Sequence, residues 1–245
     1  MFVGVDGCKG GWFAVALSAL GEPAFGVFAD IEKLWDEYRE ADVILIDIPI
    51  GLKDEGPEER ACDTEARRLL APERASSVFP TPCREALSAT TYKAACDINE
   101  RLTGKRLSKQ TWAIVPKMRE VDELLVRDAK ARERIKEVHP EICFWALAAG
   151  RPMHYPKRSE QGYLERAHIL QQAEPRAYDI IAQALAKRPK NTVARDDILD
   201  ALSAAITAST GPDALATLPQ NPETDAKGLP MQMVYSPQFL EYEWT

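Results

Sequence analysis

The N-terminal stretch alternates between apolar runs and a polar, glycine-rich turn. Residues 2–5 form a compact apolar run that is typical of a central strand. Asp6 follows at once, and three glycines between positions 7 and 11 permit a tight reversal of the chain. Residues 12–17 are apolar again, so the pattern predicts a second strand that pairs back on the first.

The next pattern predicts a strand, a helix and a second buried strand. Residues 24–29 complete an antiparallel meander, and Asp30 is a favourable N-cap for a helix of about nine residues with apolar positions at helical spacing. Residues 43–47 are apolar at consecutive positions and end in Asp47, as expected for a strand covered on both faces. If the helix forms a crossover, the first and fourth strands are parallel, and Asp6 and Asp47 lie at one edge of the sheet.

The region 52–119 has a less regular pattern. It predicts a helix near 62–70, an ordered loop over 76–84 in which two prolines exclude a helix, and a second helix running from Arg84. Several arginines and lysines make the region locally cationic. A lid that faces a substrate and a solvated helical insertion are both compatible with this pattern.

The rest of the chain is mainly helical in pattern. We expect a strand at 135–139, a loop at 151–159 and a final edge strand at 231–235. The expected helices cover residues 121–131, 164–169, 177–185 and 196–208.

Composition narrows the class of protein. The 245 residues include 31 basic and 38 acidic side chains, a net charge of −7, which disfavours non-specific binding of long duplex nucleic acid. Five cysteines without a CxxC pair indicate neither a disulfide framework nor a zinc knuckle, so we expect reduced thiols and a cytoplasmic protein. Asp6 and Lys9 interrupt the first apolar run, so no signal peptide is expected, and no apolar run reaches the roughly 18 residues of a membrane helix. The oligomeric state stays open.

Further acidic residues, which could bind a metal ion, lie on the last helix and after the fifth strand. Asp197 and Asp200 are three residues apart on one face of the last helix, although either Asp196 or Asp197 could instead be its N-cap. Glu141 follows the fifth strand and could join the cluster or pair with Arg119 or Lys117. Clustered carboxylates repel one another unless a cation compensates them, and Mg²⁺ or Mn²⁺ suits an all-oxygen site. Two such ions can clamp the attacking and leaving oxygens of a phosphodiester displacement.

The strand order, the two strand-terminal aspartates and the DxxDAL helix together resemble the ribonuclease H-like superfamily, and the last helix looks like that of Holliday-junction resolvases. Whole motifs resemble the domain of unknown function 429 family, usually described as predicted nucleases. These motifs are GVDGCKGGW at 4–12, IDIPIGL at 46–52, SVFPTPCREAL at 77–87, WAIVPKMREVD at 112–122, VHPEICFWAL at 138–147, DDILDALSAAITA at 196–208 and GLPMQMVY at 228–235.

The resemblance implies an α/β fold: one ribonuclease H-like domain over residues 1–245, with a mixed five-stranded sheet, flanking helices and a helical insertion at about 52–119. It also implies Asp6, Asp47, Asp197 and Asp200 as ligands of Mg²⁺ or Mn²⁺, with Asp47 standing where resolvases carry a glutamate.

The resulting hypothesis is a metal-dependent nuclease or phosphodiesterase. The four aspartates and Glu141 would form its catalytic group, and a water activated by the ions would attack the phosphorus. The residues expected to contact a short or structured nucleic acid are Lys117, Arg119, Arg84 and His139.

Two alternatives remain from the sequence. The glycine-rich turn after Asp6 would also suit an actin-like phosphotransferase or nucleotide hydrolase, which needs a second phosphate loop that the sequence does not reveal. A non-catalytic module that binds nucleic acid or another ligand could also carry the carboxylate pocket. The sequence does not distinguish DNA, RNA and a small phosphoester as the substrate.

Overall fold

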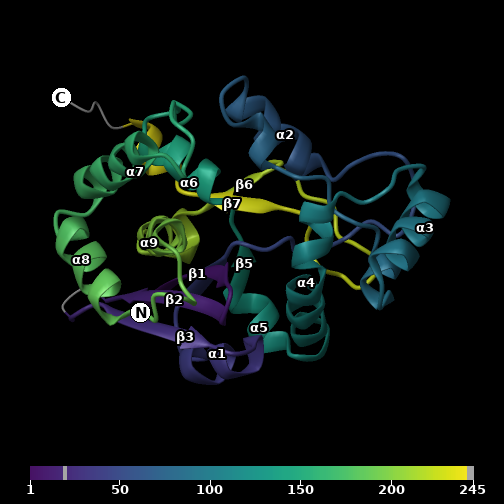
Figure 1. Cartoon of the computed structure of the whole chain (residues 1–245), viewed down its shortest axis with the longest axis horizontal. Helices are drawn as coiled ribbons and strands as arrows, with labels where there is room; N and C mark the ends of the chain where they lie inside the picture. The colour runs from purple at the N-terminus through teal and green to yellow at the C-terminus, as the bar shows by residue number, and fades with distance from the viewer. Residues whose placement is uncertain (19–20, 242–245) are drawn as a thin grey trace.

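A five-stranded mixed sheet forms the centre of the computed structural model, which describes residues 1–18 and 21–241 (Figure 1). Its strand order is β3-β2-β1-β4-β5. The strands are β1 (Phe2–Cys8), β2 (Gly11–Leu17), β3 (Ala24–Phe28), β4 (Val43–Ile46) and β5 (Ile135–Glu137). The first three strands are antiparallel, whereas β4 runs parallel to both β1 and β5. This is the ribonuclease H-like topology, which confirms the predicted fold.

Strand β1 is longer than its apolar run. Its pairing with β4 ends at Val5, whereas its pairing with β2 continues to Cys8, which lies opposite Gly11 across a two-residue turn. Asp6 is therefore still paired with β2, but it is the first residue of β1 beyond the pairing with β4. The apolar pattern could not reveal this extension, because backbone hydrogen bonds to β2 hold residues 6–8 in the strand.

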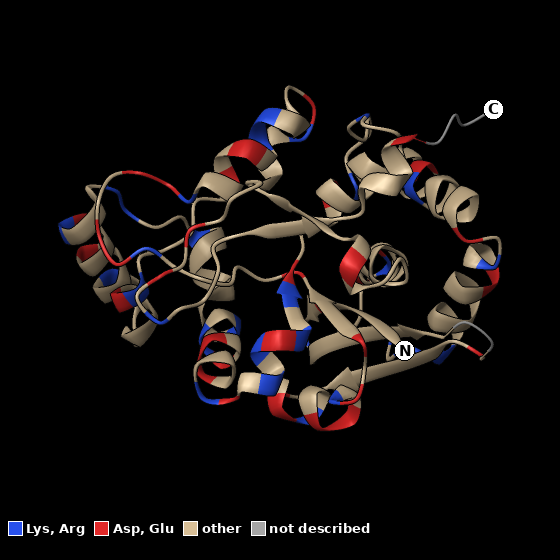
Figure 2. Cartoon of the chain, turned by 180° about the vertical axis from the view of Figure 1, so that it is seen from behind, with Lys and Arg blue, Asp and Glu red and all other residues tan. Residues whose placement is uncertain are grey.

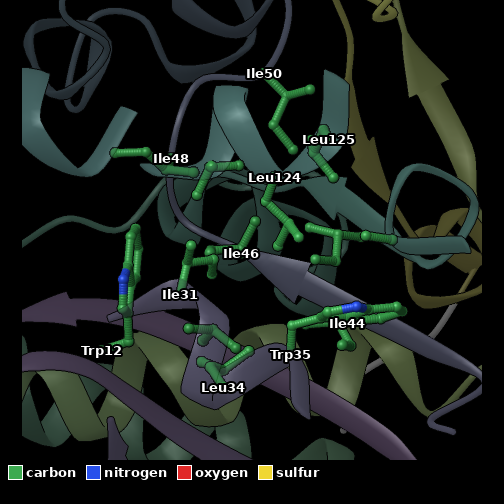
Figure 3. Close-up of a cluster of buried hydrophobic side chains, with 14 of the residues drawn as sticks. Trp12, Ile31, Leu34, Trp35, Ile44, Ile46, Ile48, Ile50, Leu124 and Leu125 are labelled. Carbon is green, nitrogen blue, oxygen red and sulfur yellow. The ribbon is translucent and has the colours of Figure 1, made fainter. Parts of the chain in front are cut away.

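One face of the sheet is covered by α1 (Ile31–Tyr38), α4 (Lys109–Arg127) and α5 (Ala129–Arg134). Side chains of β1, β2 and β4 on this face pack against these helices in a large apolar cluster that includes Trp12, Leu34, Ile44, Ile46 and Leu124 (Figure 3). The predicted cap of α1 is confirmed, because the Asp30 carboxylate accepts a hydrogen bond from the backbone N–H of Lys33 at 2.9 Å.

The opposite face is covered by α9 (Arg195–Ala208), which is seen nearly end-on in Figure 1. Around it lie α6 (Pro140–Leu147), α7 (Glu160–Ala173) and α8 (Ala177–Lys187). A Cβ atom on Gly4 of β1 would lie 2.1 Å from the carbonyl oxygen of Ala201, so only glycine permits this approach. The backbone of α9 around the small residue Ala201 therefore lies directly against the backbone of the central strand.

The helical region predicted after β4 contains α2 (Ala61–Leu70), α3 (Tyr92–Thr103) and two short 3₁₀ helices, Ala75–Ser77 and Arg84–Ser88. The helix expected from Arg84 is thus a 3₁₀ turn, a break and then α3. The acidic residues of α2 precede its arginines, whereas positive and negative residues interleave along α3 (Figure 2).

Helix α4 differs most from its prediction. It begins at Lys109 rather than at residue 121 and continues through Pro116 and across position 119. Residues Thr111, Val115 and Met118 are buried at helical spacing, and their packing outweighs the local disfavour of proline.

The C-terminal segment forms a separate hairpin. Strand β7 (Met233–Tyr235) pairs with β6 (Ala216–Leu218) in a two-stranded sheet, so the strand expected at 231–235 is present but lies outside the main sheet. The Asp225 carboxylate accepts hydrogen bonds from the backbone of Leu52 and Leu229, which joins this segment to the chain that leaves β4. Two further 3₁₀ helices are Pro212–Ala214 and Pro237–Glu241. None of the described helices is both long and apolar enough to cross a bilayer.

Candidate functional site

Asp6 and Asp47 project from adjacent parallel strands toward α9. Val5 lies opposite Ile46, so the two aspartates are the next residues along their strands. Side chains alternate between the faces of a strand, and Val5 and Ile46 point into the cluster beneath α1 and α4. The two carboxylates therefore lie on the other face, with Asp200 of α9, and all three line one cleft of about 670 Å³.

Neither strand carboxylate has a partner that neutralises it. Among the described residues, no donor forms a hydrogen bond or ion pair with the side chain of Asp6 or Asp47. Only 8% of Asp6 is exposed. Burial, together with the charges of Asp47 and Asp200, holds the pKa of Asp6 well above its ordinary value. Burial likewise raises the pKa of Asp47 to about 6, although the nearby His139 and Lys157 oppose the shift.

Asp200 differs from the strand pair because it has a cationic partner. The Lys157 ammonium donates to the Asp200 carboxylate at 2.6 Å and lies 3.9 Å from Asp196. The charge of Asp200 in turn raises the pKa of Lys157, so this ammonium stays protonated. The loop over residues 151–159, predicted as a loop, therefore carries a positive charge into the acidic cleft.

The second aspartate of the last helix has a structural contact. The Asp197 carboxylate accepts a hydrogen bond from the backbone N–H of Ala194 at 2.8 Å. Ala194 is the N-cap of α9, so the alternative that Asp196 or Asp197 is the N-cap is wrong, although Asp197 satisfies the cap backbone from the third position of the helix. Asp197 is not among the described residues that line the cleft, although its charge contributes to the raised pKa of Asp6.

Glu141 lines the cleft but pairs differently from the prediction. One carboxylate oxygen, Oε1, accepts from Arg166 of α7 at 2.6 Å, rather than from Arg119 or Lys117. The other oxygen, Oε2, is buried and has no hydrogen-bond partner among the described residues. Glu141 thus lines the cleft and has one buried carboxylate oxygen without a partner among the described residues.

His139 also lines the cleft and caps α6. Its Nδ1 accepts the backbone N–H of Glu141 at 3.2 Å, and its Nε2 lies 3.4 Å from the carbonyl oxygen of Ser77. In the neutral ring this arrangement puts the proton on Nε2, so no lone pair is free to accept a proton from a substrate.

Of the predicted cationic contacts, Lys117 alone lines the cleft. Its ammonium bonds to the carbonyl oxygen of Gly11 and lies 4.5 Å from the centre of the Trp12 ring. Arg84 forms ion pairs with Asp122 and Asp225, and Arg119 donates to backbone carbonyls of the 3₁₀ helix Arg84–Ser88 and the residue after it. Neither arginine lines the cleft, and both stabilise the insertion through these contacts.

Sequence reasoning missed four cations that line the cleft: Arg60, Arg74, Lys157 and Arg158. Arg74 donates to the backbone carbonyls of Met153 and His154, which fastens the loop carrying Lys157 to the segment after α2. These residues lie in polar stretches without periodicity, and only the tertiary fold brings them to the carboxylates.

A second buried group could also hold a metal ion. Ligand atoms of Cys62, Asp63 and Glu137 lie within 4.8 Å of one another. However, the guanidinium of Arg60 binds both carboxylates, at 2.6 Å to Asp63 and 2.7 Å to Glu137, and also donates to the carbonyl oxygen of Ile50. Arg60 therefore already supplies a positive charge to this group.

A family profile matches residues 4–224. The chain belongs to the family described as Protein of unknown function (DUF429). This match confirms the resemblance found in the motifs, and it includes both strand aspartates, the loop over 151–159 and all of α9. No curated protein and no solved structure matched the chain significantly. The chemistry of this DUF429 protein therefore has to be argued from the cleft itself.

Proposed function

We propose that this protein is a metal-dependent nuclease or phosphodiesterase whose divalent ion binds at Asp6 and Asp47. One observation carries the proposal: the buried Asp6 and the half-buried Asp47 lie on the same face of the sheet, and no described residue forms a hydrogen bond or ion pair with either carboxylate. Such an arrangement is unfavourable in a protein unless a cation binds there. A bound metal ion is the simplest compensation.

The donor set fits a hard cation. Asp6, Asp47 and the unpartnered Oε2 of Glu141 offer only oxygen atoms to the cleft. Oxygen ligands favour Mg²⁺ or Mn²⁺ over softer ions. When bound, such an ion would stabilise negative charge on phosphoryl oxygens and lower the pKa of a water molecule.

The walls of the cleft suit a phosphate-containing substrate. Lys117 and Arg158 can donate to phosphate oxygens while the acidic floor holds the ion. The Phe79 ring also lines the cleft and is 40% exposed, so an unpaired base can stack on it. Together with the net charge of −7, these features support a short or single-stranded nucleic acid over a long duplex.

An actin-like phosphate loop receives less support. The backbone N–H of Lys9 in the β1–β2 turn donates to the carbonyl oxygen of Thr192 at 3.1 Å, so it is not free to bind a phosphate. In addition, Lys9 and Gly10 do not line the described cleft. A binding module without catalysis remains as one outcome of the experiment below.

The test is turnover of bis(p-nitrophenyl) phosphate and of a labelled single-stranded oligonucleotide in Mn²⁺. We expect Asp6→Asn and Asp47→Asn each to lower turnover by at least about 100-fold, because each removes a ligand of the ion. The exposed residue Asp36 of α1 provides the control, since Asp36→Asn should stay within about twofold of the wild type. Full turnover in Asp6→Asn would refute the proposed site, and no turnover by the wild type on either substrate would favour a binding module.

A further inference from the structure

The three carboxylates of the cleft floor are not equivalent. Asp200 is 2% exposed and already bonded to the Lys157 ammonium at 2.6 Å. Asp6 and Asp47 have no such partner among the described residues. The floor thus consists of an open pair on the strands and a compensated carboxylate on the helix.

Lys157 is held in this position by the surrounding fold. The preceding residue, Pro156, packs so closely on α7 that a Cβ on Gly162 would lie 2.0 Å from the Pro156 carbonyl oxygen. The buried Arg166 donates to the carbonyl oxygen of Tyr155 at 3.1 Å, and Glu165 accepts the backbone N–H of Tyr155 at 3.0 Å. The backbone beside Lys157 is therefore fixed, and its ammonium is a built feature of the cleft.

The same arginine connects this loop to the acidic floor. Arg166 is 1% exposed and also binds Oε1 of Glu141 at 2.6 Å, so Glu141 carries its own compensating charge. Arg60 binds Asp63 and Glu137, which also line the cleft, so the cleft acids without a bound guanidinium are Asp6, Asp47 and Asp200. One ammonium and one divalent ion together balance these three carboxylates, whereas a second divalent ion would leave an excess of positive charge.

We propose that Lys157 permanently supplies the second positive charge of this site, so that the cleft binds one divalent ion, at Asp6 and Asp47, rather than two. This inference rests on the proposed metal-dependent function. Lys157 then acts as a positioning residue, because it holds Asp200 away from the ion. It also fixes an ammonium beside the place where a substrate phosphate would approach the metal.

The number of bound ions tests this proposal without any activity measurement. The full-length protein is dialysed against saturating Mn²⁺ at pH 7, and bound manganese is counted per chain. We expect one ion in the wild type, one in Lys157→Arg, which keeps the charge, and two in Lys157→Met, in which Asp200 becomes available as a ligand. Asp200→Asn should also bind one ion, and it provides an independent answer if Lys157→Met does not fold.

The possible failures are distinguishable. Two ions in the wild type, one ion in folded Lys157→Met, or loss of the ion in Asp200→Asn would each overturn the role of Lys157 and leave the proposed phosphodiesterase intact. Absence of bound manganese from the wild type would instead overturn the proposed metal site, and the role of Lys157 with it.

Discussion

Two groups of acidic residues line the cleft, and they differ in their partners. Asp63 and Glu137 are both bound by the Arg60 guanidinium, and Glu137 also accepts the backbone N–H of Ile50 at 2.6 Å. Asp47 and Asp6, one and two strands away from Glu137, have no such donor among the described residues. Burial of an acid thus does not by itself indicate chemistry, whereas a buried acid without a partner does.

The group of Arg60, Asp63 and Glu137, here called the paired group, also supports Asp6 and Asp47, the unpaired group. Arg60 donates to the carbonyl oxygens of Ile50 and Gly51, and these residues belong to the segment that leaves β4 directly after Asp47. The compensated group thereby fixes the path of the chain from which Asp47 projects. One acidic group is therefore part of the scaffold, and the other is available for binding.

The largest effect should come from breaking the paired group. Arg60→Met leaves two buried carboxylates without their cation, so we expect a loss of about 3–5 kcal/mol in the free energy of unfolding. Denaturation in urea measures it, and Arg68→Met, at an exposed position of the same helix, is the matched control. A loss below about 1 kcal/mol would mean that Arg60 does not stabilise the group.

A smaller effect of opposite sign should follow in the unpaired group. The pKa of Asp47 is raised to about 6, so the native state binds this proton more tightly than the unfolded state. The stability of the metal-free protein must then fall as pH rises from about 4 to about 6, and the full penalty persists at pH 7. Asp47→Asn removes that penalty, and we expect a gain of about 1–3 kcal/mol at pH 7.

Urea denaturation in the presence of a chelator, at pH 7 and near pH 4, measures this gain. The gain should shrink toward pH 4, because Asp47 is then largely protonated in both states. Destabilisation by Asp47→Asn at pH 7 would show instead that the ionised carboxylate has a favourable partner in the native protein.

Much of this arrangement could be predicted from the sequence. Consecutive apolar residues followed by an aspartate located two strand ends, and a crossover helix made those strands parallel, which brought Asp6 and Asp47 together. The last helix could be identified in the same way, because its apolar face and its acids have helical spacing. These features depend on local periodicity, which a sequence contains directly.

What could not be predicted depends on contacts between distant residues. Glu141 pairs with Arg166, and Asp200 pairs with Lys157, across separations of 25 and 43 residues. Helix α4 continues through Pro116 because its buried residues pack on the sheet, and this energy is not visible in local propensity. The structure was therefore needed to show which charged residues pair with each other. These pairings distinguish acids that stabilise the fold from acids that are available for binding.

The central claim is that a divalent ion binds at Asp6 and Asp47. Calorimetric titration with Mn²⁺ at pH 7 tests it most directly, in a comparison of the wild type with Asp6→Asn and Cys62→Ala. Burial raises the pKa of the Cys62 thiol, and Arg60 compensates its acidic neighbours, so Cys62→Ala should bind Mn²⁺ within about twofold of the wild type. Asp6→Asn should lose at least about 10-fold in affinity while its unfolding midpoint stays equal or rises. Unchanged binding in Asp6→Asn, with binding lost in Cys62→Ala, would contradict the account and place the metal at the paired group.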